Sequence, residues 1–162
     1  MEHVKSGDTE AREVAGKFLQ AIREQKASDF WNLLDRQGQG YFMGLWFHAL
    51  VNANVEAIIA LSGEPGFLQD VLGEMLGSLN ASLEGYMENP TFGEVDYVDD
   101  QHAYVAVFPD GKNDQVDEEE TEYIPLVLEL APGRGGDGGA AMSLTRWRVD
   151  ALKCIGFNPA AQ

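Results

Sequence analysis

Cysteine is almost absent from this chain of 162 residues, since Cys154 is the only one. A single cysteine excludes an internal disulfide and a thiolate metal cluster, and it fits a reducing compartment. We expect Cys154 to be a small apolar strand residue rather than a nucleophile. Residues 1–13 carry charges every few positions and lack the apolar run of a secretory signal. The sequence therefore predicts a cytoplasmic protein.

Positive charge is also scarce. Lys and Arg number 11 against 27 Asp and Glu, so the net charge is −16, and no Lys or Arg lies between Arg36 and Lys112. Such a surface repels phosphate backbones and anionic lipid headgroups, so we expect no nucleic-acid partner and no membrane partner. The acidic excess indicates either a basic protein partner or a well-solvated surface.

Motifs for metals, cofactors and membrane spans are missing. No phosphate-binding glycine loop is present, and His3, His48 and His102 lie far apart in sequence, so we expect no metal and no cofactor. Residues 41–61 form the longest apolar stretch, but four polar side chains interrupt it: His48, Asn52, Asn54 and Glu56. These side chains are costly in hydrocarbon, so the stretch predicts a buried helix rather than a membrane span.

Helical spacing dominates the first half of a single domain that is expected to span residues 1–162. We predict four helices, at about residues 8–25, 28–37, 41–61 and 66–88, with Gly38 and Gly40 breaking the chain between the second and third. Pro65 suits the first turn of the fourth helix. Small residues recur every four positions along that helix, which predicts a close contact with another backbone: Gly73, Gly77, Ala81 and Gly85.

Alternating apolar residues dominate the second half. Residues 95–97 and 103–108 predict a hairpin, and residues 124–130 predict a third strand that lies at an edge or bulges at Pro125. Residues 110–122 and 132–141 are expected to be acidic and glycine-rich connections. Residues 142–157 predict a closing strand with Trp147 on one face and two guanidinium groups on the other. Because the chain is acidic, the expected partners of Arg146 and Arg148 are carboxylates such as Glu129 and Glu122. The predicted fold class is α+β, with helices packed on an antiparallel four-stranded meander.

Three segments resemble the nuclear-transport-factor-2-like superfamily, the cystatin-like, cone-shaped fold of ketosteroid isomerases and polyketide cyclases. They are AGKFLQAI at residues 15–22, SDFWNLL at residues 28–34 and WRV at residues 147–149. The chain departs from the family in its middle, where two long helices replace shorter segments. The resemblance implies a cone-like fold and does not choose between enzymes and binding modules.

Two functional hypotheses follow. The first is a non-catalytic domain that forms a homodimer and binds a protein partner or a small apolar ligand. Its pocket would be lined by Trp31, Tyr41, Trp46, Tyr104 and Trp147. The alternative is a small isomerase or cyclase-like enzyme in which His48 or Asp35 acts as general base. The simpler interpretation makes His48 a boundary histidine and Asp35 a solvated helix end. An open interior faced by either residue would favour the enzyme.

Overall fold

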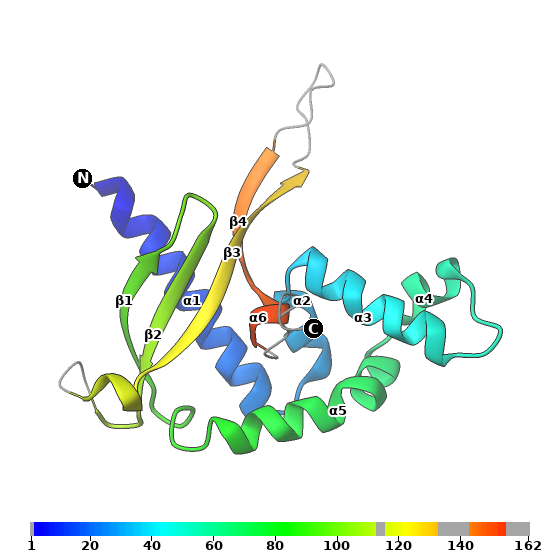
Figure 1. The fold of residues 1–162 in the computed structure, drawn as a ribbon, viewed down its shortest axis with the longest axis horizontal. Helices are drawn as coiled ribbons and strands as arrows, with labels where there is room; N and C mark the ends of the chain where they lie inside the picture. The colour runs from blue at the N-terminus through cyan, green and yellow to red at the C-terminus, as the bar shows by residue number, and fades with distance from the viewer. Residues whose placement is uncertain (1, 113–115, 133–142, 155–162) are drawn as a thin grey trace.

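The computed structural model describes residues 2–112, 116–132 and 143–154. Six α-helices and four strands are found within these ranges, and most of the helices precede the sheet (Figure 1). The α+β class and the antiparallel meander are therefore confirmed. The sheet has the strand order β1-β2-β3-β4, with β1 at Thr91–Tyr97, β2 at His102–Phe108, β3 at Glu122–Pro132 and β4 at Ser143–Val149.

Helix α1, at Glu2–Arg23, packs against one face of this sheet and starts earlier than predicted. Its apolar stripe supplies core residues such as Phe18 and Ile22, which meet Val105 and Val149 in one continuous hydrophobic cluster. Helix α2, at Ala27–Leu33, adds Phe30 and Trp31 to the same core. None of the helices in the described part of the chain combines the length and apolarity needed to cross a membrane.

The predicted break at Gly38 and Gly40 is wrong, because both glycines lie inside α3, at Arg36–Ala49. Asp35 caps this helix by accepting a hydrogen bond from the backbone N–H of Gly38. The predicted single helix over residues 41–61 is also wrong. Asn52 takes a positive φ of 69° and Asn54 caps a separate helix, α4, at Val55–Leu61. Asparagine tolerates this left-handed conformation and favours N-caps, so the chain turns there.

Helix α5, at Pro65–Ser82, has Pro65 in its first turn as predicted, but it ends six residues before the predicted end. Within the part of the chain that the structure describes, the glycines of this row make no close contact with another backbone. A Cβ built on Gly73, Gly77 or Gly85 would meet no heavy atom within 4 Å.

The closing strand is shorter than predicted. β4 ends at Val149, and a short helix, α6, follows at Ala151–Cys154, so Cys154 is helical; residues 155–157 lie outside the described ranges. The acidic connection contains a 3-10 turn, η1, at Glu118–Glu120, and its residues 113–115 are not described. Most of the glycine-rich connection, residues 133–141, also lies outside the described ranges.

Candidate functional site

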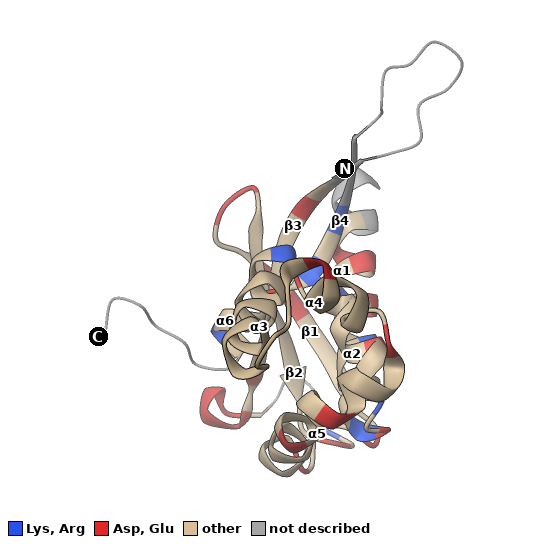
Figure 2. Ribbon diagram, turned by 90° about the vertical axis from the view of Figure 1, so that its right-hand side faces the viewer, with Lys and Arg blue, Asp and Glu red and all other residues tan. Residues whose placement is uncertain are grey.

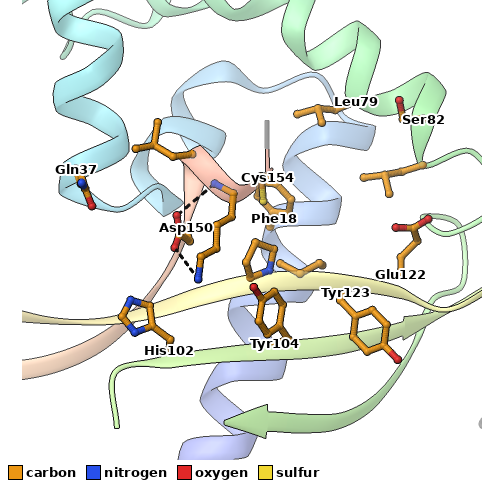
Figure 3. A pocket seen from close by; sticks show the side chains of 15 residues that line it. Phe18, Gln37, Leu79, Ser82, His102, Tyr104, Glu122, Tyr123, Asp150 and Cys154 are labelled. Atoms are coloured by element: carbon orange, nitrogen blue, oxygen red, sulfur yellow. Dashed lines mark hydrogen bonds and ion pairs between the residues drawn. The ribbon is translucent and has the colours of Figure 1, made fainter. Parts of the chain in front are cut away.

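An open groove of about 1000 Å³ lies between α5, α6 and the first half of β3 (Figure 3). Apolar and aromatic side chains form much of its wall: Phe18, Leu79, Leu83, Tyr104, Tyr123, Ile124, Pro125 and Leu152. Polar side chains complete it: Gln37, Ser82, His102, Glu122, Asp150 and Lys153. Gln37, His102 and Asp150 lie at one end, and Leu79, Ser82 and Glu122 lie at the other. A groove of this mixed character suits a ligand with an apolar body and one polar group.

The groove exists because β4 leaves the sheet early. The β3–β4 pairing stops at Leu126 and Val149, and the backbone N–H of Asp150 then donates to the carbonyl of Pro125 at 2.9 Å. The chain turns there into α6. The start of β3 pairs only with β2, which makes it an edge. The predicted edge strand or bulge at Pro125 is nevertheless wrong, because β3 lies between β2 and β4 and its register with β2 is continuous through Pro125. The missing N–H of proline is tolerated there because Pro125 lies just before the β3–β4 pairing begins.

Lys153 supplies the cation of the groove wall. Its ammonium nitrogen lies 3.8 Å from an oxygen of Asp150 and 5.5 Å from the centre of the Tyr104 ring. The side chain of Lys153 is 45% exposed and that of Asp150 is 15% exposed, so the ammonium group is the more open partner of this long ion pair.

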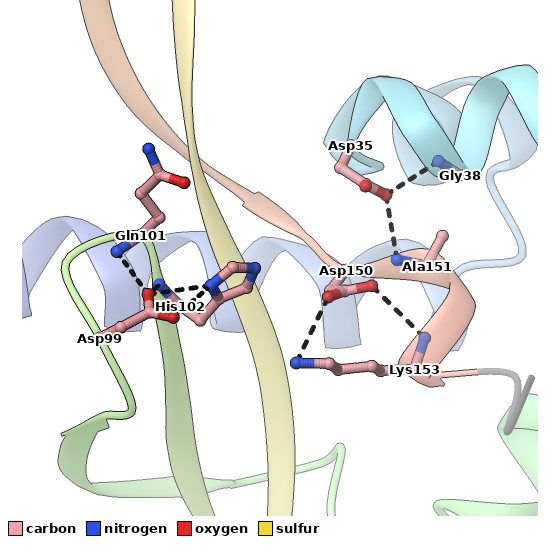
Figure 4. A network of polar contacts seen from close by, with 8 residues as sticks. All are labelled: Asp35, Gly38, Asp99, Gln101, His102, Asp150, Ala151 and Lys153. Atoms are coloured by element: carbon pink, nitrogen blue, oxygen red, sulfur yellow. Dashed lines mark hydrogen bonds and ion pairs between the residues drawn. The ribbon is translucent and has the colours of Figure 1, made fainter. Parts of the chain in front are cut away.

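His102 lies at the same end of the groove and is held by Asp99 (Figure 4). Nδ1 of His102 lies 2.9 Å from Oδ1 of Asp99. The same oxygen accepts hydrogen bonds from the backbone N–H groups of Gln101 and His102. These bonds hold the pKa of Asp99 below its ordinary value, with the Gln101 N–H contributing most. In the sequence, His102 was considered only as a possible metal ligand. The spacing of Asp99 and His102 across a predicted turn could have indicated that the two side chains interact.

Neither proposed general base lines the groove. His48 is exposed near the end of α3, where its ring contacts Phe47. Asp35 is 5% exposed, and its Oδ1 atom accepts hydrogen bonds from Gly38 N–H at 3.2 Å and from Ala151 N–H at 3.1 Å (Figure 4). Burial raises the pKa of Asp35 in spite of these two bonds. The expectation that Asp35 is a solvated helix end is wrong.

The five aromatic residues predicted to line one pocket are distributed over the fold. Only Tyr104 belongs to the groove wall. Trp31 and Trp46 are buried with their ring centres 5.0 Å apart, and Phe42 packs on both. Tyr41 contacts Phe42 in the same cluster. Trp147 is buried against Tyr97 at a ring distance of 6.0 Å. Four of the five thus pack in or against the hydrophobic core.

Cys154 also lines the groove, but its thiol is not poised for reaction. Burial raises the pKa of Cys154 to about 12, and the charges of Asp150 and Asp35 act in the same direction. The reactive thiolate is therefore scarce at neutral pH. Among the described residues, no three His, Cys, Asp or Glu side chains gather closely enough to hold a metal ion.

A second exposed feature lies on α3 and α4, outside the groove. Apolar side chains there are between 38% and 87% exposed: Leu45, Phe47, Leu50, Val51, Val55 and Ile59. We call this set the α3–α4 surface. Arg36 and Glu56 are the only Lys, Arg, Asp or Glu residues in the two helices, which appear tan over most of their length in Figure 2. No family model, curated protein or solved structure matches the chain.

Proposed function

We propose that the protein is a non-catalytic binding domain whose groove holds a small, largely apolar ligand with one anionic end. The observation that carries the proposal is the composition of the groove wall. Leu79, Leu83 and Ile124 offer apolar surface to the body of a ligand, and Lys153 offers a cation to its end. The alternative enzyme requires His48 or Asp35 to face the groove. Since neither does, we favour binding over catalysis.

Isothermal titration with 2-naphthoate tests this proposal, because the probe joins a flat apolar body to a carboxylate. Ser82→Trp places a bulky ring at the groove wall and should weaken binding strongly. Ser78→Trp is the matched control, since Ser78 is exposed one turn earlier on α5 and is not part of the groove wall. Equal binding by the two variants, or no binding by the wild type at millimolar probe, would contradict the proposal.

The proposal also includes a homodimer, formed by two copies meeting through the α3–α4 surface. Two chains of net charge −16 repel each other, so self-association is favoured at a contact with few acidic side chains. The α3–α4 surface comes near to this condition, since Glu56 is the only acidic residue of the two helices. Gly40 and Gly44, on α3, have open space where a Cβ would lie, which permits close approach of a second helix. Exposed apolar side chains that gather on one part of an otherwise charged protein are typical of a protein interface.

Light scattering after size-exclusion chromatography tests the homodimer. Val51→Lys introduces charge at the most exposed residue of the α3–α4 surface and should yield a monomer. Val98→Lys is the control, because Val98 is 62% exposed and lies after β1, away from α3 and α4. Salt should strengthen the dimer by screening the mutual repulsion. A wild-type monomer at high micromolar concentration would reject the homodimer, and a dimeric Val51→Lys variant would reject only this surface.

Two further parts of the proposal concern family and location. The order of helices and meander, with α1 against one face of the sheet, supports the cone-like fold of the nuclear-transport-factor-2-like superfamily. The single cysteine, whose thiol is held protonated, supports a reducing compartment such as the cytoplasm. Finding the native protein in a secreted fraction would contradict that location.

A further inference from the structure

Three guanidinium-bearing residues, Arg36, Arg146 and Arg148, gather around Glu129 near the junction of β4 and α3. Arg146 lies directly opposite Glu129 in the β3–β4 pairing, and Arg148 follows two residues later on the same face of β4. The start of α3 is held there because the backbone N–H of Arg36 lies 3.2 Å from each carboxylate oxygen of Glu129. Figure 2 shows the resulting blue regions on β4 and at the start of α3.

Of the two carboxylates expected to partner these arginines, Glu129 lies opposite Arg146 and Glu122 does not lie nearby. The Glu129 carboxylate accepts a hydrogen bond from the Arg36 backbone N–H, and Glu122 pairs with Val107 toward the other end of β3. Among the residues that the structure describes, neither Arg146 nor Arg148 forms an ion pair. The Nε atom of Arg146 is buried and has no hydrogen-bond acceptor in the described ranges of the chain. A buried donor of this kind calls for an explanation, and an anion that accepts from it is a direct one.

The cluster is also electrostatically unfavourable without such an anion. Burial lowers the pKa of Arg148, and the charges of Arg146 and Arg36 lower it further, while Glu129 opposes them. Of the charges that act most strongly on Arg148, two are positive and one is negative, so the surroundings of this guanidinium group are locally positive. In a protein of net charge −16, a local positive excess is unexpected.

We propose that Arg36, Arg146 and Arg148 bind the phosphate group of a small phosphorylated molecule. A phosphate monoester carries close to two negative charges at neutral pH, and its oxygens suit the planar fork of a guanidinium group. Nucleic acids are disfavoured because the surrounding acidic surface repels a polyanion. None of the three residues belongs to the groove wall, so the inference goes beyond the ligand proposed for the groove.

The test is a titration of the full chain with phenyl phosphate and with inorganic phosphate, followed through the arginine Nε–H signals by NMR. Sodium chloride at matched ionic strength is the control. We expect the Arg146 and Arg148 signals to shift with both phosphates and not with chloride. Tighter binding of phenyl phosphate would indicate a phosphorylated organic ligand, and equal binding would indicate recognition of the phosphate alone. No shift of either signal would overturn the proposal, and this outcome is independent of 2-naphthoate binding in the groove.

A variant pair separates binding from a structural role. Arg148→Gln should weaken phosphate binding roughly 10- to 100-fold, because one charged hydrogen-bonding partner is lost. It should also raise the melting temperature in phosphate-free buffer, because it removes a repelling charge. Lys17→Gln removes one charge from an exposed position of α1 and should leave both readings unchanged. The proposed phosphate site would be contradicted if Arg148→Gln had a lower melting temperature than the wild type in phosphate-free buffer and an unchanged phosphate affinity.

Discussion

One carboxylate oxygen of Asp35 accepts a hydrogen bond at 3.1 Å from the backbone N–H of Ala151, a residue 116 positions later in the chain. The same oxygen caps α3 through Gly38. Asp35 therefore fixes the start of α3 to the start of α6, and α6 forms one wall of the groove. The residue that sequence reasoning offered as a general base has a structural role.

Replacing Asp35 with Ala should lower the free energy of unfolding by roughly 2–4 kcal/mol, because two buried N–H groups lose a charged acceptor. Chemical denaturation measures the change. Asp70→Ala is the control, since Asp70 is exposed on α5, and it should change stability by less than about 0.5 kcal/mol. A fully stable Asp35→Ala variant would show that the two hydrogen bonds contribute little.

Two glycines of α3 should respond to alanine with opposite signs. A Cβ on Gly38 would collide with the Ala151 Cβ and lie 2.6 Å from Oδ1 of Asp35, so Gly38→Ala should destabilise the protein by about 1–3 kcal/mol. A Cβ on Gly40 would meet nothing within 4 Å. Gly40→Ala should therefore stabilise the helix by roughly 0.5–1 kcal/mol. Thermal melts of the two variants give the comparison, and equal shifts would contradict the packing at Gly38.

The pH dependence of stability should also report on Asp35. Burial raises its pKa above the ordinary 3.8, and Asp150 and Glu129 act in the same direction. The folded state then holds the proton more tightly than the unfolded state, so the contribution of Asp35 to stability falls as pH rises through the range just above 3.8. Asp35→Asn cannot titrate. The stability of wild type relative to Asp35→Asn should thus decrease as pH rises from about 4, and a difference independent of pH would contradict the raised pKa.

The strands were predictable from the sequence because their signal is local. Val105 and Val107 are buried and alternate along β2 with Tyr104 and Ala106, which lie on the other face of the strand. Pro125 was a misleading signal, because β3 is an interior strand of the sheet. The break between α3 and α4 was missed, because the apolar spacing continues across it through Ala53 and Ala57. The helix is interrupted by the positive φ of Asn52 and by the N-cap at Asn54. In the sequence, both residues were considered only as polar residues within an apolar stretch.

The residues of the groove were harder to predict from the sequence than the fold was. Tyr104 was named for its aromatic character, but Lys153, Asp150 and His102 come together only because β4 ends and turns into α6. Trp31 and Trp46 were candidates for a pocket, yet large aromatic rings fill a core equally well. The same limit applies to Asp35, whose second partner is distant in sequence.

Cys154 should be unreactive in the folded protein. Its pKa of about 12 leaves little thiolate at pH 8, so iodoacetamide should label it slowly, and unfolding in denaturant should restore the rate of a free thiol. Mass spectrometry of timed samples measures the labelling. Rapid labelling under native conditions would mean that α6 leaves the groove wall.

If Cys154 does not react, a cysteine introduced by Val51→Cys can be cross-linked selectively. This cysteine should join two copies of the chain if the α3–α4 surface pairs with itself.

A crystal structure of the protein with 2-naphthoate tests the central claim, binding in the groove, most directly. The proposal predicts the ring system between α5 and β3, against Leu79 and Ile124, with its carboxylate toward Lys153. A structure in which the probe occupies another site while the groove contains only water would contradict the proposed function.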